Sequence, residues 1–136
     1  MLQIKRETDY AIRCLYYLSG KKDEVVMVDE IAREMRIPKT FLAKILQRLA
    51  KAGLVQSYVG VKGGFYLAKE PQEINLYEVI TAIEGPVAMN KCTVNKKSCG
   101  FSKTCKVHPI WVAVRKESEG VLKKNTFKKI REAQIR

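Results

Sequence analysis

Two short helical segments separated by a proline constrain the fold of this chain most strongly. Ile37-Pro38 interrupts the pattern between them, because the residue before a proline disfavours helical backbone angles. The first segment, residues 29–35, is acidic in its first turn, and the second can open with Pro38 at its first position and runs to Gly53. Apolar residues mark one side of the second segment: Phe41, Leu42, Ile45, Leu46 and Leu49. This spacing predicts a helix-turn-helix.

A β-hairpin is predicted directly after this pair. The runs LVQSYVG and FYLAK are rich in valine, tyrosine, phenylalanine and leucine, and the loop between them contains Gly60, Gly63 and Gly64. Such a hairpin behind a helix-turn-helix is a wing. The fold class is therefore mainly α with a small β-hairpin, a winged helix-turn-helix.

Further helices are predicted on both sides of this unit. Residues 8–19 form an amphipathic helix that Thr8 can cap, with Cys14 on its apolar stripe as a core residue. Another helix follows Pro71 and ends at Gly85-Pro86. A long helix runs from Pro109 to about Lys124, and Thr126 caps a last short one.

These elements divide the chain into three regions. Residues 1–85 form a winged helix-turn-helix domain, residues 86–108 form a loop with little periodicity that carries three cysteines, and residues 109–136 form a long helix and a C-terminal tail. Because the loop lacks apolar periodicity, its order has to come from something other than a hydrophobic core, such as a bound metal centre.

Charge is segregated along the chain. The formal net charge is +12, and the seven basic residues between Met35 and Lys69 meet no acidic one. A one-signed stretch over a recognition helix and a wing is what contact with phosphates requires. The sequence therefore predicts binding to double-stranded DNA, against the alternative of a merely solvated basic face.

The predicted DNA contacts follow from the position of each residue on these elements. The N-terminal part of the second helix is expected to enter the major groove and to meet base edges, whereas its C-terminal part reaches the backbone. Glycine at the wing tip permits close approach to the backbone, and a lysine there contacts phosphate or the minor groove. The expected contacts are Lys39, Thr40 and Lys44 at the bases, Arg48 and Lys51 at the backbone, and Gly60 and Lys62 in the wing.

Three cysteines and the chain's one histidine form a possible metal site. Cys92, Cys99, Cys105 and His108 are separated by six, five and two residues. Structural zinc sites usually begin with more closely spaced cysteine pairs, whereas the ligands of a larger iron-sulfur cluster can come from an open loop. The spacing alone leaves zinc and an iron-sulfur cluster both open.

The chain resembles the IscR, NsrR and CymR group of bacterial winged-helix regulators over nearly its whole length. The resemblance is carried by TDYAIR, DEIAREMRIPKTFLAKILQRLAKAGLV, VKGGFYLA and CKVHPIW. It implies homodimers that bind palindromic operators, with a long C-terminal helix that makes the dimer contact. The dimer residues it implies are Ile110, Trp111, Val114, Val121 and Leu122.

The same resemblance favours an iron-sulfur cluster held by the three cysteines. His108 is the expected fourth ligand of a 2Fe-2S cluster, and the alternative is a 4Fe-4S cluster to which the partner subunit's helix contributes Asp9. Two departures from the family pattern, Val59 before the first wing glycine and Ala43 in the recognition helix, imply a different operator. The function implied is a repressor whose DNA affinity reports iron-sulfur, redox or nitric oxide status, and the alternative is a cluster-free regulator that uses its cysteines for zinc or thiol sensing.

Other function classes are disfavoured. There is no second histidine for acid-base chemistry and no glycine-rich nucleotide loop after a strand, so we expect neither an enzyme nor a small-molecule substrate. No stretch approaches the length of about 20 apolar residues that spans a bilayer, and the N-terminus MLQIKRETDY lacks the apolar region of a signal peptide. We therefore expect a cytoplasmic protein with no membrane partner.

Overall fold

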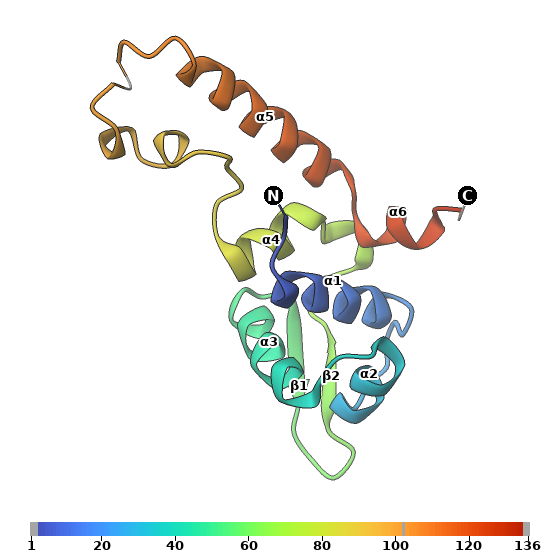
Figure 1. The fold of residues 1–136 in the computed structure, drawn as a ribbon. Helices are drawn as coiled ribbons and strands as arrows, with labels where there is room; N and C mark the ends of the chain where they lie inside the picture. Colours follow the sequence, from blue (N-terminus) through green and yellow to red (C-terminus); the bar gives the residue numbers. More distant parts are fainter. Residues whose placement is uncertain (1–2, 102, 135–136) are drawn as a thin grey trace.

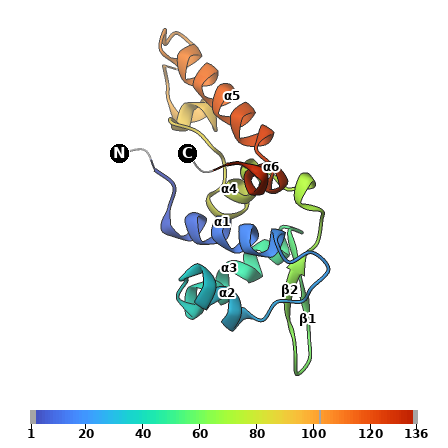
Figure 2. The same ribbon diagram turned by 90° about the vertical axis from the view of Figure 1, so that its right-hand side faces the viewer.

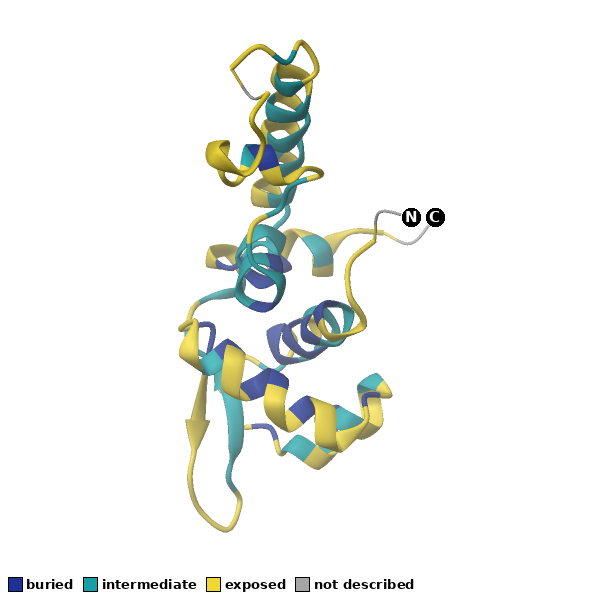
Figure 3. Cartoon of the chain, turned by 60° about the vertical axis from the view of Figure 1, so that its left-hand side comes forward, coloured by how far each residue is buried: buried dark blue, intermediate teal, exposed yellow. Residues whose placement is uncertain are grey.

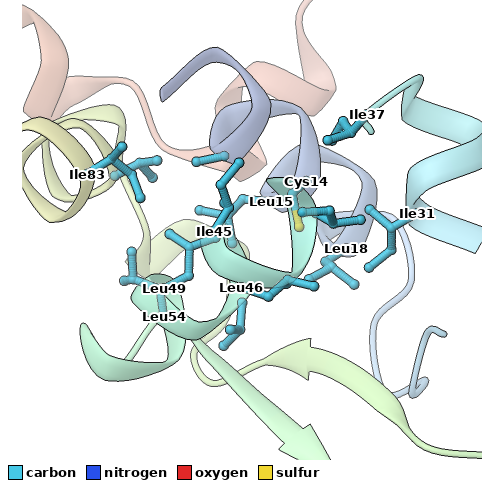
Figure 4. Packing of buried hydrophobic residues seen from close by; sticks show 14 of the residues in the cluster. Cys14, Leu15, Leu18, Ile31, Ile37, Ile45, Leu46, Leu49, Leu54 and Ile83 are labelled. Carbon is cyan, nitrogen blue, oxygen red and sulfur yellow. The ribbon is translucent and has the colours of Figure 1, made fainter. Parts of the chain in front are cut away.

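Helix α1 (Arg6–Ser19) lies at the centre of the fold. The computed structural model describes residues 3–101 and 103–134, and within them the helix-turn-helix and hairpin lie on one side of α1 and the C-terminal elements on the other (Figures 1 and 2). The apolar face of α1 is buried against its neighbours (Figure 4). Cys14 is among its fully buried residues, which confirms it as part of the core.

The helix-turn-helix consists of α2 (Val28–Met35) and α3 (Lys39–Lys51). The turn between them depends on Arg36, which adopts left-handed backbone angles (φ 54°, ψ 50°). Pro38 precedes α3 as its N-cap and is not its first helical residue, and its carbonyl accepts a hydrogen bond from Leu42 N at 3.0 Å. Ile37, between these two residues, is buried in the core.

The wing is an antiparallel pair of strands, β1 (Val55–Tyr58) and β2 (Gly64–Leu67), with Val55 opposite Leu67 and Tyr58 opposite Gly64. Val26 exchanges two backbone hydrogen bonds of 2.9 Å with Phe65 and so extends the pair on its other edge. A Cβ atom at Gly64 would lie 2.1 Å from the carbonyl oxygen of Val26. Glycine at this position therefore lets the segment before α2 approach the wing.

Helix α4 (Leu76–Glu84) begins later than the sequence pattern suggests. After the short 3-10 turn η1 (Pro71–Glu73), Ile74 is extended, and Asn75 caps α4 by accepting a hydrogen bond from Glu78 N at 2.9 Å. Ile74 is fully buried, and its carbonyl accepts a hydrogen bond from Phe127 N at 2.9 Å. The C-terminal region thus returns to the body of the molecule.

That return is made by α6 (Phe127–Glu132), which Thr126 caps through Lys129 N at 3.2 Å, as the sequence predicts. Arg131 fastens it to the end of α1, because its Nη2 donates to the carbonyl of Tyr16 at 2.8 Å. The region predicted as residues 109–136 therefore contains a long helix and, after it, α6, and α6 packs on the winged domain.

Thr8 does not cap α1. Lys5 occupies the N-cap position, and Thr8 lies fully buried inside the helix. Its hydroxyl donates to Glu84 Oε2 at 2.6 Å, at the end of α4. The reason is tertiary packing: the first turn of α1 lies against α4, and the threonine hydroxyl satisfies a carboxylate there.

Helix α5 (His108–Lys124) projects from the body, with the cysteine segment at its far end (Figures 1 and 3). The segment before it contains the short 3-10 turns η2 (Lys91–Thr93) and η3 (Lys96–Ser98). None of the residues of α5 is fully buried. Within the described ranges, no helix has the length and apolar character needed to cross a lipid bilayer.

We expect Phe127→Ala to lower the free energy of unfolding by about 3–5 kcal/mol, the range for truncating a buried phenylalanine. The side chain is 0% exposed and anchors the return of the C-terminal region. Urea unfolding followed by circular dichroism measures the change. Val61→Ala, at a valine that is fully exposed on the wing, is the control and is expected to change it by less than about 0.5 kcal/mol. Equal effects of the two substitutions would contradict the packing described.

Candidate functional site

The outward face of α3 is polar and basic. The buried residues Leu42, Ile45, Leu46 and Leu49 form its inner side, so Thr40 and Lys44 point away from the core and are exposed. Gln47 shares this outer face and is also exposed. The sequence analysis missed Gln47, although its spacing from Lys44 and Thr40 on a helix would have identified it.

Two of the basic residues on α3 have partners within the chain. Lys39 Nζ lies 2.5 Å from Asp29 Oδ1, an ion pair that joins α3 to α2. Arg48 Nη1 donates to Glu7 Oε2 at 3.2 Å, and its Nη2 donates to the carbonyl oxygen of Ile83. Lys39 and Arg48 are therefore partly engaged within the chain, and Lys44 and Lys51 are also exposed.

The wing tip presents exposed residues around a tight turn. Gly60 has a φ of 150°, in the region that favours glycine, and its carbonyl accepts a hydrogen bond from Gly63 N at 3.0 Å. Lys62 is exposed at this tip. Val59 and Val61 on either side of Gly60 are 92% and 101% exposed. The tip extends beyond α2 and α3, at the bottom of Figure 1.

The cysteine segment brings His108 close to one cysteine and into a pocket with another. His108 begins α5, and its Nδ1 lies 3.1 Å from Cys92 Sγ, which is buried. Cys99 is exposed and lines an open pocket together with His108. Cys105 is half-buried, and its amide donates to the carbonyl of Phe101 at 2.7 Å.

The four predicted ligands share this end of the molecule but are not assembled around one point. Among residues 3–101 and 103–134, no three His, Cys, Asp or Glu side chains gather closely enough to hold a metal ion. Arg115 on α5 holds the segment beside Cys92 through the carbonyl of Thr93, and it pairs with Glu119 at 2.8 Å. Cys92 and the residue after it therefore contact α5 through His108 and Arg115.

Asp9 lies apart from these ligands. It is in the first turn of α1 and pairs with Arg13 at 2.7 Å, one helical turn further on. Figure 1 shows α1 in the body of the molecule and the cysteine segment at the distal end of α5. Asp9 in the body and His108 at the far end of α5 are therefore separated within one chain.

The predicted dimer residues form a partly uncovered stripe on α5. Ile110 and Val121 are 57% and 58% exposed, and Trp111, Val114 and Leu122 are half-buried. Near its C-terminal end, Val121 and Leu122 border a shallow apolar groove with Ile4, Ile80 and Val87. Large apolar side chains exposed together mark a surface that associates with another surface.

Comparison with known proteins assigns the family. A model of the Rrf2 family, described as iron-dependent transcriptional regulators, matches residues 4–133. The chain belongs to the Rrf2 family. A helix-turn-helix-type transcriptional regulator of Aquifex aeolicus is 35% identical over 121 residues, which cover 88% of this chain and 84% of that protein.

A further relative supports this assignment, and a solved structure shows the same fold. NsrR of Shouchella clausii, a helix-turn-helix-type transcriptional regulator, is 33% identical over 108 residues, or 78% of this chain and 72% of that protein. The fold is similar to that of CymR, the global cysteine regulator of Bacillus subtilis, with a TM-score of 0.80 and 24% identity over 99% of this chain and 100% of CymR. The predicted winged fold and the regulator family are confirmed, and the family and its relatives are transcriptional regulators, not enzymes.

The four cysteines are expected to differ in their reaction with iodoacetamide at pH 8. Burial raises the pKa of the Cys14 thiol to about 12, so it remains protonated and covered, whereas Cys99 is exposed. Peptide mass spectrometry of the metal-free, reduced protein is expected to find Cys99 alkylated within minutes. Cys14 is expected to react only after denaturation in urea, and rapid native alkylation of Cys14 would contradict its place in the core.

Proposed function

We propose that this regulator is a cytoplasmic homodimeric repressor whose affinity for a palindromic operator is set by an iron-sulfur cluster. The observation that carries the proposal is the position of His108 at the start of α5, where it contacts Cys92 Sγ and shares a pocket with Cys99, at the opposite end of the subunit from the wing. This arrangement separates a ligand-holding end from a DNA-binding end. Helix α5 connects the two.

The DNA-binding end is formed by α3 and the wing. Thr40, Lys44 and Gln47 present a hydroxyl, an ammonium and an amide on one exposed helix face, which suits base edges in the major groove. Lys51 at the end of α3 and Lys62 at the wing tip suit phosphates on either side. The glycine turn at Gly60 lets the wing backbone approach the DNA.

The proposed dimer uses the apolar stripe on α5. Helix α5 buries none of its residues fully and exposes Ile110 and Val121. Contact with a second apolar surface would remove these side chains from water and so stabilise the helix. A second copy of the chain supplies the same surface with two-fold symmetry. Two recognition helices related in this way read the two halves of a palindrome.

The donor set fits a cluster. Three thiols and one imidazole are ligands that iron-sulfur centres use, and the pocket between Cys99 and His108 is open to solvent. Cys92, Cys99, Cys105 and His108 would hold a 2Fe-2S cluster. A 4Fe-4S cluster would use Asp9 of the partner subunit as its fourth ligand. When bound, the cluster supplies a centre that responds to oxidants and nitric oxide.

The chain's own contacts connect this site to the dimer helix. His108 is both a candidate ligand and the first residue of α5, and Arg115 joins α5 to the carbonyl that follows Cys92. Ordering residues 86–108 therefore fixes the N-terminal half of α5. A change in that order shifts the dimer contacts and with them the spacing of the two recognition helices.

A second candidate function is a cluster-free regulator that uses zinc or thiol oxidation. The contact of 3.1 Å between His108 Nδ1 and Cys92 Sγ favours it, because a histidine-thiol pair binds zinc and also activates a thiol. The DNA-binding end works in the same way in both cases. Metal analysis distinguishes them.

After anaerobic purification we expect about two iron and two sulfide per chain and a visible absorption spectrum of a 2Fe-2S cluster. Cys92→Ala, Cys99→Ala and Cys105→Ala are each expected to lose most of the iron, because each removes a ligand. Cys14→Ala is the matched control and is expected to retain it. Zinc without sulfide would establish the second candidate, and about four iron per chain, lost in Asp9→Ala, would establish the 4Fe-4S alternative.

Operator affinity is expected to change by at least about fivefold between the cluster-bound protein and Cys99→Ala, the lower end of usual coupling between sites. Anaerobic fluorescence anisotropy with a duplex selected by the wild-type protein measures it. Equal affinities of cluster-bound protein and Cys99→Ala would refute the coupling.

In the same assay Lys62→Met is expected to reduce the slope of log affinity against log salt by about 0.9, because one phosphate contact is lost.

A further inference from the structure

Arg48, on the proposed recognition helix α3, donates hydrogen bonds to two other helices of its own chain. Its Nη1 donates to Glu7 Oε2 at 3.2 Å, and its Nη2 donates to the carbonyl oxygen of Ile83. Glu7 is in the first turn of α1, and Ile83 is in the last turn of α4. We propose that Arg48 is a positioning residue that sets the orientation of α3 for base readout, and is not a phosphate contact.

The chemistry of the two acceptors supports this role. Ile83 is one of the last residues of α4, so its carbonyl lacks a partner within that helix and lies at the negative end of the helix dipole. A guanidinium is planar and always charged, and it holds two acceptors in fixed directions. Arg48 therefore satisfies an unpaired carbonyl and a carboxylate at the same time.

Orientation, more than stability, is what these bonds supply. The side chains of Arg48 and Glu7 are 45% and 48% exposed, and ion pairs of such exposure add little to the free energy of unfolding. The buried apolar face of α3 sets its approximate rotation, but apolar contacts are not directional and leave small rotations to be fixed by hydrogen bonds. Hydrogen bonds from one side chain to two other helices restrict rotation of α3 about its own axis. That rotation decides which side chains meet base edges.

The anchor point is the end of α4, where α1 is also fastened. Thr8 Oγ1 and Lys5 N both donate to Glu84 Oε2, at 2.6 and 3.2 Å. Immediately afterwards Gly85, with a φ of 92°, turns the chain toward the cysteine segment. Because α3 is bonded to Ile83, its orientation follows the position of the last turn of α4. This is a path within one subunit from residues 86–108 to the recognition helix.

The two possible roles of Arg48 make opposite predictions. A phosphate contact releases counterions, so its loss lowers the salt dependence of binding and weakens all DNA sequences alike. A positioning residue contributes to base readout, so its loss weakens the preferred sequence and leaves the salt dependence unchanged. The inference rests on the proposed sequence-specific DNA binding.

The test compares Arg48→Met, Glu7→Gln and wild-type protein, with Lys51→Met as the control for a phosphate contact. A duplex enriched by the wild-type protein from a randomised pool and a scrambled duplex of the same composition are titrated over a range of salt. Circular dichroism and thermal unfolding verify that each variant is folded. All proteins are prepared in the same cluster state.

For Arg48→Met we expect operator affinity to fall by about tenfold, scrambled-duplex affinity to change by less than about twofold, and the salt slope to stay the same. Glu7→Gln keeps the arginine but removes the negative charge of one acceptor and so weakens that bond, and the preference for operator over scrambled duplex is expected to fall as well. Lys51→Met is expected to weaken both duplexes alike and to lower the slope by about 0.9.

The proposal is overturned if Arg48→Met lowers the slope by about 0.9 and weakens both duplexes equally, as the control does. It is also overturned if Glu7→Gln strengthens both duplexes with a steeper slope, because that result means the freed arginine binds phosphate. If Arg48→Met does not fold, the result for Glu7→Gln decides between the two roles. The Glu7 side chain is half-exposed, so its substitution is expected to leave the fold intact. Wild-type protein that binds both duplexes equally would refute specific DNA binding itself, and this inference with it.

Discussion

The burial of one face of α1 is the constraint on which the rest of the structure depends. Ala11, Cys14, Leu15 and Leu18 are all at most 1% exposed. The elements that cover this face come from widely separated parts of the chain: α3 from the helix-turn-helix, α4 after the wing, and α6 near the C-terminus. In Figure 4 the side chains of α3 and α1 interleave at the centre of this cluster. The helix-turn-helix and α6 therefore share one core, although the cysteine segment and α5 lie between them in the sequence.

Helix α5 is the exception to this packing, and the exception is informative. It lies between α4 and α6, two elements with buried residues, yet it buries none of its own completely. A helix of 17 residues with exposed isoleucine and valine is costly to leave in water. Its N-terminal end is held by the cysteine segment and its C-terminal end by the turn into α6. On the proposed function, a helix held at both ends and covered only in part is the element that a second copy of the chain would complete.

Most of the fold could be predicted from the sequence, because the spacing of the apolar residues matches the helix or strand that each segment forms. The helix-turn-helix, the wing and the core role of Cys14 all follow from spacing and turn residues. Thr8 and Ile74 were assigned wrongly for a common reason: each position is decided by a distant partner. Thr8 meets Glu84, and Ile74 pairs with Phe127, contacts that no local rule contains.

The candidate site residues also divide into those that local sequence predicts and those that depend on distant partners. Exposure of Thr40, Lys44 and Lys62 follows from helical spacing and the wing turn, so these residues could be identified from the sequence. Gln47 could also have been found, but a search for charge overlooks a neutral amide. The partners of Arg48 could not be found, because Glu7 and Ile83 are distant in sequence and one of them offers only its backbone carbonyl.

Charge and orientation make separate contributions to DNA recognition in this fold. The basic stretch from Arg36 to Lys69 attracts any duplex, since every sequence carries the same phosphates. On the proposed function, preference for one sequence requires that α3 present Thr40, Lys44 and Gln47 at a fixed angle. In this chain the arginine within that helix is bonded to the two helices that form the body. A regulator that is to respond to a signal gains from this division, because a small rotation of α3 removes preference for the operator while general attraction to DNA persists.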